Sequence, residues 1–61
     1  MDRQEWIDRY LNHAIRRGWI EQREKQKYQP DENTERLQEI FANDPESAAE
    51  YVALWFEQEA N

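Results

Sequence analysis

Residues 2–18 read DRQEWIDRYLNHAIRRG and predict an amphipathic helix with both of its ends marked. Asp2 is a good N-cap, and Glu5, three residues later, gives the spacing of a capping box. Apolar side chains recur every three to four residues, which places them on one face of a helix. They are Trp6, Ile7, Tyr10, Leu11, Ala14 and Ile15. Gly18 is expected to close the helix in a left-handed conformation, with Trp19 folding back onto the last turn.

The next stretch, residues 19–29, is rich in helix formers but has no apolar stripe. A break at Gly18 followed by a short helical segment at about 19–28 is the favoured interpretation. Continuation of the first helix through Gly18 is the alternative. Pro30 ends either arrangement, because the residue before a proline avoids the α region.

Two further helices are expected. The first, at about 32–42, has several candidate N-caps in residues 31–34, and Asn43 is a candidate left-handed residue beyond its end. The second begins at the sequence Asp44-Pro45, since aspartate at the N-cap and proline at the first helical position are typical of a helix start.

The final helix, at about 45–59, carries apolar residues almost all the way round. Such a helix is central to a bundle, or one of its faces meets another protein. We therefore expect an all-α fold, a small three-helix bundle (helices about 2–17, 32–42, 45–59) with the final helix central and a short segment at about 19–28. The whole chain, 1–61, is expected to form a single helical domain.

Length and composition exclude several classes of protein. The chain has 61 residues, with no cysteine and one histidine. This length excludes multi-domain enzymes, nucleotide-binding α/β folds and TIM barrels. The absence of cysteine excludes a disulfide scaffold and a thiolate metal site, and it is compatible with a reducing cytosol. No apolar run approaches the roughly 20 residues of a membrane span, so we expect a cytoplasmic protein that does not interact with a membrane.

The net charge of -6 is divided unevenly along the chain. Residues 1–29 hold seven Lys or Arg and five Asp or Glu, a net charge of +2, whereas residues 30–61 hold one Arg and nine Asp or Glu, a net charge of -8. The two halves either compensate each other across the bundle, or the acidic face recognises a charged partner. The basic patch consists of Arg16, Arg17, Arg23, Lys25 and Lys27.

Residues suited to catalysis or metal binding are few. His13 has no second His or Cys to complete a metal site, and Ser47 stands in the first turn of a helix, where its ordinary role is hydrogen bonding to the helix N-terminus. Glu32, Glu35 and Glu39 share a helix face, but no glycine-containing loop converges on them as in a calcium site. We therefore expect no enzymatic activity, no cofactor and no metal. These carboxylates form either a solvated face, which is the favoured interpretation, or a face that docks another protein.

A nucleic-acid role is the second class of function. Gly18 could be the turn of a helix-turn-helix, with 19–28 as the recognition helix. Glu21 and Glu24 on the same segment oppose this, so we do not expect direct nucleic-acid binding. An acidic inhibitor that mimics DNA fits the charge better.

The pair Trp55-Phe56 is the most specific feature of the final helix. Either both rings pack, one on each neighbouring helix, or an exposed ring beside Glu57 and Glu59 is an interface anchor. The leading hypothesis is a non-enzymatic accessory or regulatory protein that binds another protein; a self-associating homodimeric bundle is a further alternative. The expected partner-binding residues are Trp19 and Trp55 as apolar anchors, with Glu35, Glu39, Glu46 and Glu50 for electrostatic steering.

Overall fold

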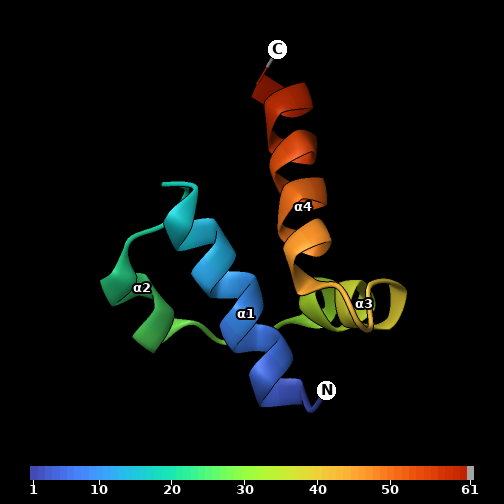
Figure 1. The fold of residues 1–61 in the computed structure, drawn as a ribbon. Helices are drawn as coiled ribbons and strands as arrows, with labels where there is room; N and C mark the ends of the chain where they lie inside the picture. Colours follow the sequence, from blue (N-terminus) through green and yellow to red (C-terminus); the bar gives the residue numbers. More distant parts are fainter. Residues whose placement is uncertain (61) are drawn as a thin grey trace.

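The computed structural model describes residues 1–60 of the chain, and the side chains of residues 1–58. These residues form four helices and no strand, which confirms an all-α fold. The helices are α1 (Arg3–Arg16), α2 (Gln22–Lys27), α3 (Glu32–Ile40) and α4 (Pro45–Ala60) (Figure 1). The side chain of Glu59, expected beside the exposed ring, lies outside the described set.

Both predicted ends of α1 are confirmed within one residue. The Asp2 carboxylate accepts a hydrogen bond from the Glu5 backbone N–H at 2.7 Å. Gly18 has φ 80°, the left-handed region in which glycine is favoured. The Trp19 N–H donates to the Ala14 carbonyl at 2.9 Å, so the chain folds back over the last turn. The alternative in which α1 continues through Gly18 is wrong.

The basic connection forms α2, which is shorter than the expected 19–28 segment. Residues 19–21 form the link from α1, and the helix occupies only Gln22–Lys27. None of its residues is fully buried. Tyr28 ends the helix in an extended conformation, two residues before Pro30. The described residues therefore form the three expected helices and the short helical segment, α2.

α3 ends at Ile40, two residues earlier than predicted, while its start agrees with the sequence. Asp31 caps it by accepting the Thr34 N–H at 3.0 Å. Asn43 is not left-handed, since Gly18 alone among the described residues has a positive φ. A turn in which the Asp44 N–H donates to the Phe41 carbonyl at 3.0 Å connects α3 to α4 and needs no left-handed residue.

The predicted start of α4 is confirmed. The Asp44 carboxylate accepts the backbone N–H of Ser47 at 3.2 Å and its hydroxyl at 2.5 Å. Pro45 occupies the first helical position and is buried.

The core is centred on α1 rather than on α4. Trp6 is 0% exposed, and its indole Nε1 donates to the Phe41 carbonyl at 2.8 Å, which ties α1 to the turn between α3 and α4. Ala48 and Ala49 are buried against α1, where small side chains allow two helices to approach closely. Only the first half of α4 is buried in this way, so the prediction of a central final helix holds for that half alone.

The arrangement in Figure 1 explains this difference. α1 and α4 meet where α4 begins, and they diverge toward their C-terminal ends. α3 lies across the start of α4, and α2 lies on the other side of α1. The end of α4 therefore extends beyond the rest of the molecule. In the part of the chain that the structure describes, no helix has the length and apolarity needed to cross a membrane.

Candidate functional site

The exposed half of α4 carries an apolar surface that the fold does not cover. Pro45, Ala48, Ala49 and Val52 recur at helical spacing and face the molecule, and Phe56 continues the same stripe. Because α1 diverges from α4, Phe56 is 65% exposed. The expectation that Trp55 and Phe56 both pack against neighbouring helices is therefore wrong.

Three neighbouring side chains enlarge this surface. Leu54 is 58% and Trp55 59% exposed, and Tyr51 is half-exposed with its ring 5.8 Å from that of Phe41. We call Tyr51, Leu54, Trp55 and Phe56 the α4 apolar surface. Large apolar side chains surround much of this part of the helix, because four of the five residues 52–56 are larger than alanine.

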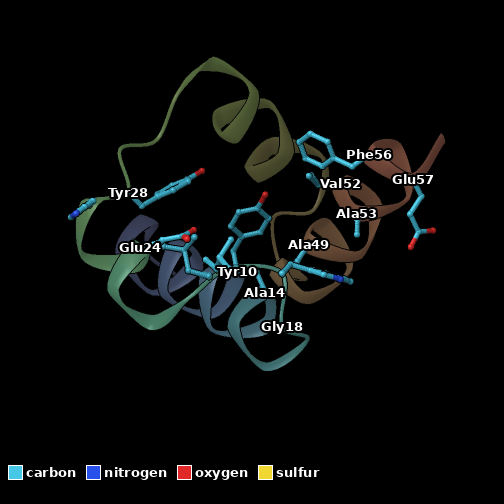
Figure 2. Close-up of a pocket in the computed structure, with 14 residues that line it drawn as sticks. Tyr10, Ala14, Gly18, Glu24, Tyr28, Ala49, Val52, Ala53, Phe56 and Glu57 are labelled. Atoms are coloured by element: carbon cyan, nitrogen blue, oxygen red, sulfur yellow. The ribbon is translucent and has the colours of Figure 1, made fainter. Parts of the chain in front are cut away.

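A groove of about 730 Å³ joins this surface to α1. We call it the α1–α4 groove. Tyr10 and Ala14 of α1 and Ala49 of α4 lie along it, and Val52 and Phe56 form the α4 side. Figure 2 shows Val52 and Phe56 facing the ring of Tyr10, with Tyr28 beyond it and Glu57 pointing outward. Further lining residues come from the link after Gly18 and from α2, notably Trp19, Ile20, Glu24 and Lys27.

Tyr10 is fixed within this groove. Its ring stacks on that of Trp6 with centroids 5.2 Å apart. Burial raises the pKa of the Tyr10 hydroxyl to about 12, and the negative charge of the Asp31 carboxylate adds to this effect. The Tyr28 hydroxyl is hydrogen-bonded to Thr34 Oγ1, which in turn donates to Asp31. The tyrosine at the far end of the groove is therefore held in place as well.

Most of the acidic residues expected to contact a partner are paired within the chain. Glu46 accepts two bonds from the Arg9 guanidinium, at 2.6 and 3.1 Å. Glu50 lies 3.1 Å from His13 Nε2 and 3.4 Å from Arg17 Nε.

Arg9, His13 and Arg17 follow one another at four-residue spacing and face α4. We call the ion pairs of Arg9 with Glu46 and of Arg17 with Glu50 the charge ladder; His13 contacts Glu50 between the two arginines. In addition, Glu35 pairs with Arg3 at 3.2 Å, whereas Glu39 has no ion pair among the described residues.

The basic patch is similarly divided. Arg17, besides contacting Glu50, lies 5.2 Å from the centre of the Trp19 ring. Arg23 pairs with Glu21 at 2.7 Å, and Lys25 donates to Asn12 at 3.0 Å. Of the five basic residues, Arg16 and Lys27 are the two with no ion pair among the residues described.

The residues considered for catalysis have structural partners. His13 contacts Glu50, and its ring also meets the Trp19 ring edge-on with centroids 6.1 Å apart. The Ser47 hydroxyl donates to the Asp44 carboxylate, which caps α4. Within the described chain, no cluster of three or more His, Cys, Asp or Glu side chains has the arrangement of a metal site.

Comparison with protein-family models, with curated proteins and with solved structures gave no match. The proposed function therefore rests on the α4 apolar surface and the α1–α4 groove.

The sequence indicated Trp55 and Trp19 but not the α1–α4 groove, which is lined by Trp19 and not by Trp55. Tyr10 and Ala14 belong to the predicted core stripe of α1, and nothing in that stripe indicates that its C-terminal end faces an opening. The available signal was the uninterrupted apolar run 51–56. One helix in a bundle this small cannot bury all its sides, so such a run indicates an uncovered face.

Proposed function

We propose that this protein is a non-enzymatic protein-binding module, and that it contacts its partner with the α4 apolar surface and the adjoining α1–α4 groove. The observation that carries the proposal is the exposure of Leu54, Trp55 and Phe56, each more than half accessible on a well-formed helix. Contiguous exposed apolar surface of this kind is typical of interaction sites, and tryptophan is enriched among the residues that dominate binding energy.

The total accessible surface supports the same proposal. A compact monomer of 7.6 kDa exposes about 4,300 Å². This chain exposes 4853 Å², an excess of about 550 Å². A larger surface than that of a compact chain of this mass agrees with an α4 whose apolar side chains stay uncovered.

In this proposal the charged residues have separate tasks. Glu46 and Glu50 hold α4 against α1 through the charge ladder, so their contribution to a partner is indirect. Trp55 and Trp19 remain the proposed anchors, and Glu39 remains the carboxylate available for steering. The acidic chain would then act as an accessory or regulatory protein through contact with its partner rather than through chemistry.

The test is differential capture from a nuclease-treated lysate of the source cells. Three baits are compared, namely the natural chain, Trp55→Ser and Ile40→Ser. Ile40 is 72% exposed but lies on α3, outside the proposed surface, so its variant is the matched control. We expect a protein recovered by the natural chain and by Ile40→Ser, and lost from Trp55→Ser. Equal recovery by all three baits would contradict the proposal.

Nuclease treatment and sedimentation separate the other functions. A partner lost on nuclease treatment indicates a bridge of nucleic acid. A chain that sediments as a dimer, and becomes monomeric in Trp55→Ser, indicates that the surface serves self-association.

A further inference from the structure

We infer that the α1–α4 groove receives one amphipathic α-helix of another protein, and that Lys or Arg side chains flank the apolar face of this helix. The inference rests on the proposed function and names the chemistry of the partner.

The shape of the groove suits a helix. Its two sides are α1 and α4, which touch at one end and diverge at the other (Figure 1). A helix placed between two diverging helices completes a bundle with ordinary interhelical distances of about 8–10 Å. Two helical turns, taken as a cylinder about 10 Å wide and about 11 Å long, occupy about 850 Å³. The groove volume of about 730 Å³ is of this size.

An extended peptide has less to gain from this site. Residues 1–60 contain no strand, so they offer no sheet edge with which a peptide could pair its backbone. The groove is lined mainly by apolar side chains such as Val52, Phe56 and Ile20. A peptide whose backbone polar groups are unpaired would lose free energy on entering it, whereas a helix satisfies its own backbone hydrogen bonds.

The charges around the opening favour a cationic helix. Residues 37–61 contain no Lys or Arg, and the last turn of α4 has no basic residue. The negative end of the α4 dipole therefore has no cation of its own chain in that turn. Glu24 of α2 and Glu57 of α4 line the groove, and Lys27 is the one cation that does so among the described residues. Arg17, near Trp19, pairs with Glu50 and does not line the groove.

A second copy of this chain is a poorer occupant. Its α4 would bring another acidic helix without Lys or Arg, and each copy carries a net charge of -6. Like charges brought together at an apolar contact oppose association. A helix with flanking Lys or Arg gains the same apolar contact and has the opposite charge.

Binding of synthetic peptides tests the inference. The probe is a fluorescently labelled helical peptide with Leu on one face and Lys along both edges of that face. The matched control has Glu in place of every Lys. Fluorescence anisotropy at physiological salt measures both affinities for the full chain. We expect the Lys peptide to bind at least about tenfold more tightly than the Glu peptide.

Variants locate the binding site. Phe56→Ser should weaken the Lys peptide by about tenfold or more, since an exposed anchor is removed without disturbing the core, and circular dichroism verifies that the helices remain. Ile40→Ser should bind as the natural chain does. Glu24→Lys combined with Glu57→Lys should shift the preference toward the Glu peptide.

Equal binding of the two peptides would overturn the inference. Equal effects of Phe56→Ser and Ile40→Ser on binding of the Lys peptide would also overturn it. A chain dimer that Phe56→Ser dissociates would overturn it as well, because the groove would then hold a second copy. If these peptides fail while Trp55→Ser still loses a partner in differential capture, the inference is wrong and the proposed function stands. If the capture also shows no difference, both are wrong.

Discussion

At the scale of single residues, Trp6 contributes to the fold in a way that neither of the other two tryptophans does. It is fully buried, its indole N–H bonds the Phe41 carbonyl, and its ring stacks on Tyr10. One side chain thus connects α1, the turn before α4 and one side of the groove. Trp55, by contrast, is mostly exposed and belongs to the α4 apolar surface.

Replacing Trp6 by phenylalanine should therefore be costly. Trp6→Phe leaves a cavity and removes the bond to the Phe41 carbonyl, so we expect the free energy of unfolding to fall by about 2–3 kcal/mol. Urea denaturation followed by far-UV circular dichroism measures it. The matched variant, Trp55→Phe, should change stability by no more than about 0.5 kcal/mol. Equal losses in the two variants would show that Trp6 is not the central contact.

Tyr10 gives the chain a distinctive response to alkali. Because its pKa in the folded protein is about 12, above the ordinary value of about 10, the folded state holds the hydroxyl proton more tightly than the unfolded state does. This contribution to stability is intact below about pH 10 and is lost as the pH rises through about 12. Melting temperatures across this range should fall less steeply in Tyr10→Phe than in the natural chain. Tyr51→Phe, at an exposed tyrosine, should leave the steep fall of the melting temperature unchanged. A shallower fall in Tyr51→Phe than in Tyr10→Phe would show that Tyr10 is not the tyrosine responsible.

At the scale of elements, local signals were sufficient to predict the helices. Asp2, Gly18 and the Asp44-Pro45 pair mark ends that depend on a few neighbouring residues, and each was predicted correctly. The errors occurred where such signals were weak. No apolar stripe defines α2, and the turn closed by Asp44 ends α3 two residues early.

Two caps should make the fold sensitive to acid. Hydrogen bonds from the side chain and backbone of Ser47 lower the pKa of Asp44, and those from Thr34 lower the pKa of Asp31. A lowered pKa means that this stabilisation is present above the unfolded value of about 3.9 and is lost as the pH falls through the folded value. Asp31→Asn combined with Asp44→Asn keeps the acceptors but removes the titration. The melting temperature of this variant should therefore fall less on acidification than that of the natural chain.

Glu39→Gln is the control for the acid experiment, because Glu39 caps no helix. It should show the acid sensitivity of the natural chain. An acid response that is identical in all three proteins would mean that the caps do not determine it.

The charge ladder between α1 and α4 is testable by exchange of charges. Arg9→Glu places two carboxylates together and should lower the melting temperature at low salt. Adding Glu46→Arg to that variant should restore most of the loss, because the pair is re-formed with its charges exchanged. If the double variant is no more stable than the single one, the Arg9–Glu46 contact does not hold these helices together.

At the scale of the whole molecule, the dominant feature is a bundle left open at one end. The radius of gyration is 11.2 Å, against about 10.5 Å for a compact domain of this length. The larger value agrees with an α4 that extends past its neighbours. The split of charge along the sequence has a structural counterpart too, because cations of α1 pair with carboxylates of α3 and α4.

The run 51–56 indicated that some face of α4 is uncovered, but which face stays open could not be predicted from the sequence. Whether Phe56 is covered depends on the angle at which α1 and α4 diverge, and that angle is determined by contacts between residues far apart in the chain, such as Trp6 and Phe41. For the same reason the sequence could not distinguish Glu46, which is paired internally, from Glu39, which is not. The residue types of the candidate site were visible, but their grouping required the tertiary structure.

Photo-crosslinking in the source cells tests the central claim most directly. The photoreactive amino acid p-benzoylphenylalanine is placed at position 55 in one chain and at position 40 in another, and crosslinked peptides are identified by mass spectrometry. We predict that position 55 crosslinks to a single partner protein and that position 40 does not. Crosslinks at position 55 that join two copies of this chain, or that match those at position 40, would contradict the account.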